Sequence, residues 1–241
     1  MNTNNISNII DAFKKLDIEL NQRQAEQFEI FYEFLVEKNK VMNLTAITEF
    51  EDVLNKHFLD SLMILRHIDM DKVGNVLDMG TGAGFPGIPL KIIFPEIPFT
   101  LADSLNKRIL FLNEVIDKCG LEKIETIHTR AEELGRNKIY REKYDLVVSR
   151  AVANLSTLSE YCLPFVKKGG VFVSYKSASV EEEYEKARKA ITLLGGQCEG
   201  PVMDRIPDTD LERSFLIIKK VKNTPGKYPR KAGLPGKEPL G

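Results

Sequence analysis

The stretch from Val76 to Gly87 constrains the fold more than any other part of the chain. Apolar residues lead directly into glycines at alternate positions, Gly80, Gly82 and Gly84. Glycine has no Cβ, so such a loop turns sharply and lets a ligand approach the backbone closely. The pattern therefore predicts a buried strand that ends in a ligand-binding loop.

The glycine spacing alone leaves two kinds of ligand open. Gly82 to Gly87 also spells G-x-G-x-x-G, the fingerprint of dinucleotide-binding folds. Asp78, however, lies two residues before Gly80 and puts negative charge beside the loop. A carboxylate suits a cationic or hydroxyl-bearing ligand better than an anionic pyrophosphate. The loop therefore favours a sulfonium cofactor over a dinucleotide.

Composition limits the class of protein. The 241 residues are 43% hydrophobic, enough for a globular α/β core. The three cysteines form no C-x-x-C pair, which predicts neither disulfides nor zinc and favours the cytoplasm. His67 and His128 have no partners at metal spacing, so we expect no metal site. We also expect neither secretion nor a membrane span, because no signal-like or long apolar segment occurs.

The charge is distributed unevenly along the chain. The formal net charge is −1, but residues 219–241 contain seven Lys or Arg and one acid and carry +6. A polyanionic partner is one explanation of this tail, and a solubilising end is the other. Frequent proline and glycine over 223–237 predict an extended segment without helix or strand. Such a segment can follow a phosphate backbone, with Tyr228 available for stacking.

Hydrophobic periodicity predicts the elements. Helical spacing indicates helices over 6–20 and 21–41, with aromatic residues in the core, and Thr48 and Glu51 suggest a capping box for a third. Beyond residue 74, short apolar runs alternate with amphipathic segments, as in a parallel sheet of βαβ units. Strands are expected over 75–79, 99–103, 124–129, 145–149 and 171–175, with a last strand over 214–221 beside 197–202, and helices over 86–93, 105–119, 154–166 and 179–194.

These elements predict an α/β, Rossmann-like fold with a mostly parallel, twisted sheet and helices on both faces. We divide the chain into an N-terminal helical extension over 1–72, a Rossmann-like domain over 73–222 and a basic tail over 223–241. In open α/β sheets, ligands bind beyond the carboxyl ends of the strands. Asp103 ends the second strand, where its carboxylate can accept hydrogen bonds from ribose hydroxyls, or else cap the helix that begins near Leu105.

Several blocks identify a family. They are Asn43-Leu44-Thr45, His57–Leu62, the glycine loop through Phe85-Pro86-Gly87, Arg150-Ala151-Val152 and Lys227–Lys231. Their order resembles the class I methyltransferases that use S-adenosylmethionine, and more narrowly the RsmG (GidB) family. The resemblance implies methylation of N7 of one guanine, guanine 527, in 16S ribosomal RNA. It covers nearly the whole chain.

The resemblance also implies roles for individual residues. Asp103 would hold the ribose, and Arg150 would reach either the methionine end of the cofactor or the incoming base. Phe85 could instead pack under the loop, and Glu132 could cap the following helix. The residues that the resemblance places at the cofactor are Gly80, Gly82, Phe85, Asp103, Ala131, Glu132 and Arg150.

The end of the fourth strand bears on the chemistry. Methyltransferases acting on exocyclic amines often carry an Asp or Asn, two prolines and an aromatic there, whereas this chain has Ser149-Arg150-Ala151-Val152. Guanine N7 has a free lone pair and no proton to lose, so methylation needs positioning and no general base. His57, Asp60 and Ser61 fall on one helical face, so we expect a polar cluster joining the N-terminal helices to the loop, or a substrate contact, and no catalytic triad.

An RNA substrate requires cations that hold phosphate. The tail candidates are Lys227, Arg230, Lys231 and Lys237, and those near strand ends are Lys107, Arg108, Lys167 and Lys168. We expect the tail to serve RNA alone, so that removing it leaves cofactor affinity unchanged. The expected partner is 16S ribosomal RNA in the small subunit or an assembly intermediate, bound by a monomer. A nicotinamide-dependent oxidoreductase and an inactive Rossmann domain that binds nucleic acid are the competing hypotheses.

Overall fold

The computed structural model describes residues 3–150, 152–177 and 180–241, and a single sheet organises them. Ala151, part of one block used above, and residue 179, the expected first residue of a helix, lie outside the described residues. The strands are β1 (Val76–Met79), β2 (Phe99–Asp103), β3 (Ile124–His128), β4 (Tyr144–Arg150), β5 (Val166–Ser177), β6 (Gly196–Gln197), β7 (Pro201–Arg205) and β8 (Glu212–Lys220).

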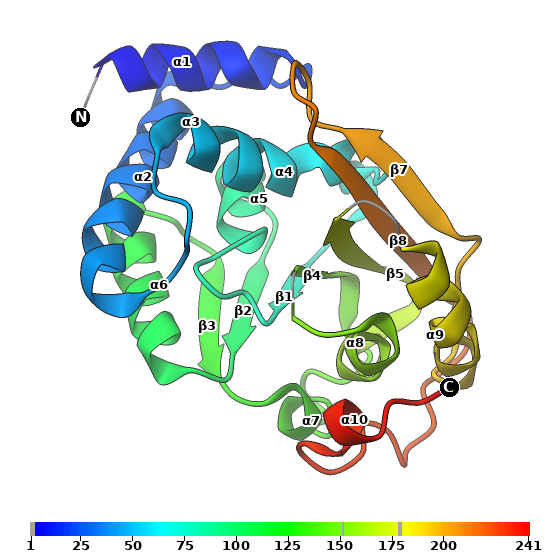
Figure 1. Ribbon diagram of the computed structural model, residues 1–241. Helices are drawn as coiled ribbons and strands as arrows, with labels where there is room; N and C mark the ends of the chain where they lie inside the picture. Colours follow the sequence, from blue (N-terminus) through cyan, green and yellow to red (C-terminus); the bar gives the residue numbers. More distant parts are fainter. Residues whose placement is uncertain (1–2, 151, 178–179) are drawn as a thin grey trace.

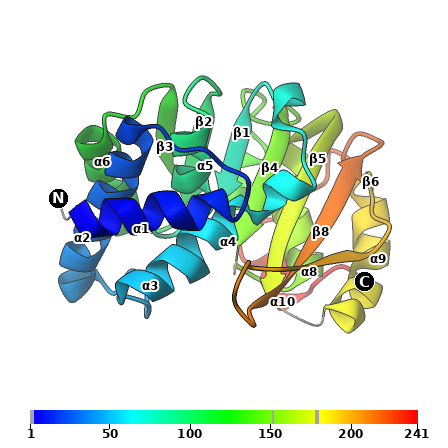
Figure 2. The ribbon, with the colours of Figure 1, turned by 90° about the horizontal axis from the view of Figure 1, so that it is seen from above.

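The sheet has the order β3-β2-β1-β4-β5-β8-β6, visible from above in Figure 2, and β7 also pairs with β8. Strands β1 to β5 run parallel, and β8 runs antiparallel to β5. The mostly parallel sheet is thus confirmed, and so is the pairing of the last strand with the segment around 197–202. Parallel neighbours need crossover connections, and the connections between β1 and β5 carry α5, α6, α7 and α8.

The helices cover both faces of the sheet (Figure 1). The α-helices are α1 (Thr3–Lys14), α2 (Gln22–Met42), α3 (Phe50–Val53), α4 (Asp60–Leu62), α5 (Gly87–Ile93), α6 (Asn106–Cys119), α7 (Ala131–Leu134), α8 (Leu155–Cys162), α9 (Glu181–Leu193) and α10 (Leu234–Lys237). A π-helical turn over Leu54–Leu59 joins α3 to α4, and short 3₁₀ turns cover Met63–Arg66, Met70–Lys72 and Leu163–Phe165.

The side chains of each strand point alternately to the two faces of the sheet, and this divides the core into two layers. Leu146 and Val148 of β4 join a cluster with α1, α2, α5 and α6, whereas Val147 faces a second cluster with α8 and α9. Successive side chains of a strand point to opposite faces, so a strand buried on both sides is apolar throughout. This is why the central strands are continuous hydrophobic runs in the sequence.

Aromatic rings attach the N-terminal helices to the sheet layer. The ring of Phe28 lies 4.6 Å from that of Phe13 and 5.0 Å from that of Phe58, measured between centroids. Phe31 stands 5.2 Å from Phe85, which belongs to the glycine loop. The expected core position of these aromatic residues is confirmed. The same cluster packs against Phe85 of the glycine loop.

The capping box predicted at Thr48 is absent. The helix after Thr48 begins at Phe50, and its N-cap, Glu49, makes no side-chain cap bond. The reciprocal capping box lies instead at Asn21 and Gln24, at the start of α2. The prediction from Thr48 and Glu51 is wrong because the spacing of polar residues alone does not specify the backbone geometry that a cap requires.

The tail is packed against the body of the protein. It contains α10, contrary to the expected absence of helix, and Tyr228 is buried, so its ring is not available for stacking on a base. Arg141 donates to the carbonyl oxygens of Thr224 and Tyr228, at 2.7 and 2.8 Å. The prolines restrict the tail backbone without preventing it from folding onto a surface that satisfies its carbonyls. Among the described residues, each helix is too short or too polar to cross a lipid bilayer.

The aromatic cluster gives a prediction about stability. Replacing Phe28 with Ala should lower the free energy of unfolding by about 3–5 kcal/mol, because it empties a fully buried ring position between two other rings. Leu110→Ala, at an exposed position on α6, should change it by less than about 0.5 kcal/mol. Urea unfolding measures both, and equal losses in the two variants would contradict the assigned core.

Candidate functional site

Two cavities adjoin at the carboxyl edge of the parallel strands. The main cavity, of about 400 Å³, is lined by Leu44, Thr45, His57, Gly80, Thr81, Gly82, Ala83, Phe85, Asp103, Ser104, Arg108, Arg150 and Val152. The side cavity, of about 150 Å³, is lined by Met79, Gly80, Asp103, Ser104, Thr129, Arg130, Ala131, Glu132, Val152, Tyr161 and Gly233. Gly80, Asp103, Ser104 and Val152 line both, so the cavities form one groove.

Asp78 builds the glycine loop and does not line the groove. Its Oδ2 accepts a hydrogen bond from Thr81 Oγ1 at 2.7 Å and one from the Gly87 N–H at 2.8 Å. The carboxyl group is fully buried, and this burial raises its pKa to about 7. The expectation that Asp78 offers negative charge to a ligand is therefore wrong, because the carboxyl group is buried and its Oδ2 binds within the loop.

Gly80 shows why the loop needs glycine. Its φ is +73°, and a Cβ at this position would lie 2.5 Å from Cγ2 of Val152. Both the left-handed backbone and the close approach exclude a larger residue. The backbone of the loop can therefore form the floor where the two cavities meet.

Asp103 is the acid that faces the groove. Its Oδ2 accepts from the Gly82 N–H at 2.9 Å, and its Oδ1 accepts from the Leu105 N–H at 2.9 Å. Arg108 pairs with the same carboxylate at 3.1 Å. An ionised carboxylate has about four acceptor sites, so Asp103 holds the loop and the start of α6 and still has acceptor capacity at the groove. The N-cap of α6 is Leu105, and α6 has no side-chain cap bond, so the helix-capping interpretation of Asp103 is wrong and the ribose interpretation stays a prediction.

Arg150 lies in a cluster that joins β4 to the N-terminal helices. Its guanidinium donates to Asp60 Oδ2 at 2.6 Å and to Nδ1 of His57 at 3.2 Å, and its carbon Cζ lies 5.0 Å from the centroid of the Phe85 ring. The His57 ring stacks on Phe85 at 4.4 Å. The expected polar cluster between the N-terminal helices and the glycine loop is confirmed.

The hydrogen bonds and ion pairs of this cluster are not those of a catalytic triad. Ser61 is buried and donates to the carbonyl oxygen of His57, and Asp60 pairs with Arg150 and with Arg213 of β8. No proton path runs from Ser61 through His57 to Asp60, which agrees with the sequence-based interpretation.

His57 is held in its neutral form. Burial, followed by the positive charge of Arg150, lowers its pKa to about 4. Its Nδ1 lies 3.2 Å from Nη2 of Arg150 and 3.0 Å from the carbonyl oxygen of Lys56, and its Nε2 lies 2.9 Å from Thr45 Oγ1. His57 therefore links the 43–45 segment to Arg150 and has no free nitrogen for acid–base work.

Ala131 and Glu132, at the start of α7, line the side cavity. Glu132 is 5% exposed, and its Oε1 accepts a hydrogen bond from the N–H of Gly233 at 2.8 Å. Gly233 belongs to the tail, which the sequence analysis did not connect with the cofactor. The tail therefore forms part of the wall of this cavity.

The expected phosphate contacts on the tail divide into two groups. Lys227, Lys231 and Lys237 are exposed on the tail, whereas Arg230 is fixed against the buried Glu160. The Nε and Nη2 groups of Arg230, on one edge of its guanidinium, bind the Glu160 carboxylate, which argues against the expected role of this side chain in holding phosphate.

The cations near strand ends also differ from expectation. Lys107 is exposed beside the groove, and Arg108 lines the groove and pairs with Asp103. Lys167 and Lys168 lie at the start of β5, at the opposite edge of the sheet, where Lys167 pairs with Asp145. They lie at the amino end of the strand, so the sheet places them away from the groove at the carboxyl edge.

Within the part of the chain that the structure describes, no group of three or more His, Cys, Asp or Glu side chains is arranged to hold a metal ion. His67 lies 3.1 Å from Asp204, and His128 lies 3.1 Å from the carbonyl oxygen of Ser104.

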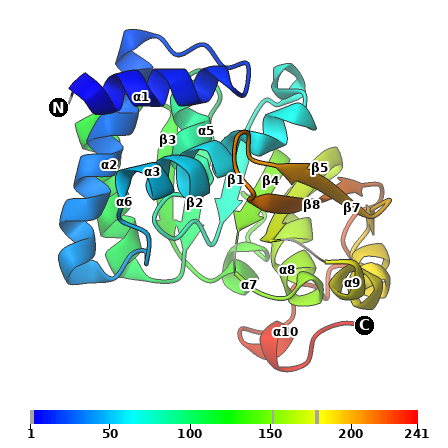
Figure 3. The same ribbon diagram turned by 45° about the horizontal axis from the view of Figure 1, so that its top comes forward.

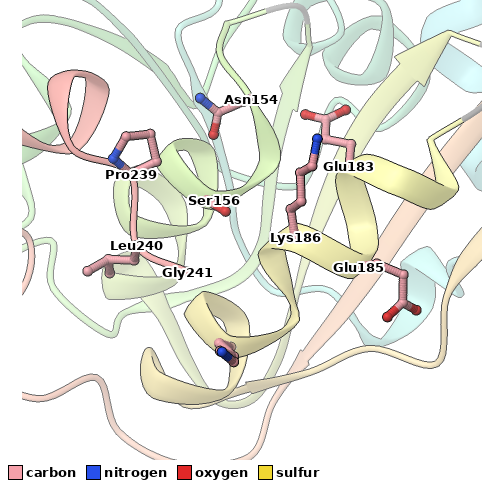
Figure 4. Close-up of a pocket in the computed structure, with 9 residues that line it drawn as sticks. Asn154, Ser156, Glu183, Glu185, Lys186, Pro239, Leu240 and Gly241 are labelled. Atoms are coloured by element: carbon pink, nitrogen blue, oxygen red, sulfur yellow. The ribbon is translucent and has the colours of Figure 1, made fainter.

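A larger cavity, of about 580 Å³, lies between α8, α9 and residues 239–241 (Figure 4). Its most buried acid, Glu183, is already engaged by the Leu155 N–H and by Lys176. The remaining charged groups, Glu185, Lys186 and Lys189, come from one exposed helix. Size therefore does not make it the functional site, whereas the groove gathers polar groups from four strand ends.

Sequence reasoning missed several groove residues. Thr45 and Val152 belong to recognised blocks but were given no role. Tyr161 lies in a helix whose apolar pattern hides its inward hydroxyl, and Gly233 lies in a segment that seemed free of long-range contacts. Thr45 and Val152 could have been suggested from the sequence, because each lies in a block that resembles the family. Tyr161 and Gly233 could not.

Two solved structures with a similar fold are named as O-methyltransferases. The model aligns with a Thermotoga maritima SAM-dependent O-methyltransferase at a TM-score of 0.53 and 14% identity, covering 78% of this chain and 72% of that one. It aligns with the StiE O-MT domain at a TM-score of 0.55 and 14% identity, covering 81% and 90%. The sheet order and the groove thus define a Rossmann-like class I S-adenosylmethionine-dependent methyltransferase fold.

Sequence comparison narrows this class to one family. A family model described as GidB, rRNA small subunit methyltransferase G, matches residues 24–202. A relative of that name from Lachnoclostridium phytofermentans is 55% identical over 97% of both chains, and one from Bacillus subtilis is 48% identical over 98% of this chain and 99% of its own. The chain belongs to the GidB family, and it is a methyltransferase, as the resemblance implied.

The buried acid of the loop predicts a pH dependence. The pKa of Asp78 is about 7 in the folded protein, whereas an unfolded chain releases this proton near pH 4, so this group contributes less stability as the pH rises from about 4 to 7. Asp78→Asn should remove this slope. The stability difference between wild type and variant should therefore fall by a few kcal/mol across that range, at about 1.4 kcal/mol per pH unit.

Urea unfolding at several pH values measures this difference. The opposite slope from His57 is present in both proteins and cancels in the subtraction. Asp210→Asn, at an exposed position, is the matched control and should give a curve parallel to that of the wild type. A parallel curve for Asp78→Asn as well would contradict the assigned protonation.

Proposed function

We propose that this protein transfers a methyl group from S-adenosylmethionine to N7 of a guanine in 16S ribosomal RNA. The observation that carries the proposal is the groove in which the main and side cavities meet at Gly80 and Asp103, in a chain of the GidB family. The proposed setting is the cytoplasm, with a monomer acting on the small subunit or an assembly intermediate.

The shape and chemistry of the groove fit the two ends of the cofactor. In this proposal the adenine occupies the side cavity against Ala131 and Glu132, and the amino-acid end occupies the main cavity. The ribose lies between them at Asp103, whose carboxylate accepts its hydroxyl protons. Gly80 lets the cofactor approach the backbone, and Gly82 and Phe85 line the main cavity beside it.

The cofactor supplies an electrophilic methyl group on a sulfonium centre. The protein's task is then to hold a guanine so that N7 lies in line with that methyl group, because well-oriented reactants lose most of the entropic barrier. N7 carries a free lone pair and no proton, so no side chain has to act as a base. The two occupied nitrogens of His57 agree with this requirement.

Arg150 acts as a positioning cation in this proposal. Its hydrogen bonds to Asp60, His57 and the carbonyl oxygen of Lys56 use three of its five N–H groups. The remaining N–H groups can bind either the cofactor carboxylate or guanine O6. Methyl transfer places positive charge on the purine, so we place the guanidinium at one of these acceptors and away from N7.

The RNA must present an unstacked guanine to the main cavity. The exposed side chains of Lys227, Lys231 and Lys237 are the proposed phosphate contacts on the tail, with Lys107 beside the groove. Contacts of this kind position RNA without reading its sequence, and salt weakens them.

The ribose assignment gives a quantitative prediction. Asp103→Asn should weaken S-adenosylmethionine binding by about tenfold to a hundredfold, because hydrogen bonds to a charged group contribute about 1.5–3 kcal/mol. Asp145→Asn, at the amino end of β4, is the matched control and should bind like the wild type. Calorimetry measures both, and unchanged affinity in Asp103→Asn would contradict this placement of the ribose.

The reaction itself is tested with purified protein, methyl-labelled S-adenosylmethionine and small ribosomal subunits from cells lacking this enzyme. Digestion and mass spectrometry should identify labelled 7-methylguanosine at one site. Label on an exocyclic amine or a ribose would contradict the proposed chemistry. Failure of the wild-type protein to bind the cofactor would contradict the proposed function as a whole.

A further inference from the structure

The tail, residues 223–241, does more than carry exposed lysines. Gly233 lines the side cavity, and its N–H donates to Oε1 of Glu132 at 2.8 Å. Glu132 comes from α7, so a segment near the end of the chain and the residues after β3 form one wall. Figures 1 and 3 show α10, which follows Gly233, beside α7 and α8.

Two residues of α8 hold the tail, one on each side of Gly233, and we call these contacts the anchors. Upstream, Arg230 donates through Nε to Oε1 of Glu160 at 3.0 Å and through Nη2 to Oε2 at 2.7 Å. Glu160 is fully buried, so this fork-shaped pair is shielded from water. Downstream, Thr157 Oγ1 donates to the carbonyl oxygen of Pro235 at 2.9 Å. The two anchors fix the short segment that carries Gly233.

The backbone of Gly233 is suited to this position. Its φ is +80°, and a Cβ would meet open space, so the conformation and not crowding requires glycine. The N–H that Gly233 donates to Glu132 fixes the direction of the carboxylate. Lys231 is exposed two residues away, so an outward cation and an inward N–H occur in one short stretch.

We propose that residues 229–235 form a wall of the adenine subsite, with Gly233 holding Glu132 as an acceptor for the amino group of a 6-aminopurine. This inference rests on the proposed function and extends it to a segment that the sequence analysis assigned to RNA alone. The expectation that cofactor affinity is independent of the tail is thereby replaced: removing the tail opens the adenine end of the groove.

The test uses the full chain and calorimetry with S-adenosylhomocysteine and with adenosine, without RNA. Gly233→Pro removes the N–H and cannot adopt the observed φ. It should weaken binding of both ligands by about tenfold or more, since both contain the adenine. Gly226→Ala, in the same tail where a Cβ meets open space, is the matched control and should bind within about twofold of the wild type.

A second variant keeps the inference testable if Gly233→Pro fails to fold. Arg230→Lys retains the charge but loses the two-pronged contact with Glu160, so it should weaken both ligands by a smaller factor. Wild-type affinity in both folded variants would overturn the inference while leaving the proposed function intact. Absence of binding in the wild type would instead overturn the proposed function.

Discussion

The carboxylate of Asp60 ties the separate parts of the site together. It is buried at the start of α4 and pairs with Arg150, at the end of β4, and with Arg213 of β8. Breaking a buried ion pair costs about 3–5 kcal/mol, because the remaining charge loses its partner. Ion pairs as well as aromatic packing therefore hold the N-terminal helices against the sheet. The Asp60–Arg150 ion pair lies beside Phe85, which lines the main cavity.

Four buried or nearly buried acidic side chains have different structural roles around the groove. Asp78 holds the glycine loop, Asp103 faces the cavities, and Glu132 and Glu160 fix the tail. Each accepts at least one backbone N–H, which explains how acids can lie so deep in a protein interior. The groove consequently draws on the N-terminal helices, the sheet and the tail, and its shape depends on contacts between residues far apart in the sequence.

Much of the fold could be predicted from sequence because its strands are buried on both faces. The predicted bounds of β2 are those observed, and the glycine loop and Asp103 lie at the expected edge of the sheet. The tail could not be predicted, since its order comes from distant partners such as Glu160 and Arg141 that local composition does not reveal. The role of Asp78 was misjudged for a related reason: spacing located the acid but not the direction of its oxygen atoms.

The most direct test of this account is a crystal structure of the protein with S-adenosylhomocysteine. The account predicts one continuous ligand across both cavities, with the ribose hydroxyls within hydrogen-bond distance of Asp103, the adenine beside Glu132 and Gly233, and the amino-acid end near Arg150. A ligand seated instead in the cavity between α8 and α9, or one that leaves Asp103 without a contact, would contradict it.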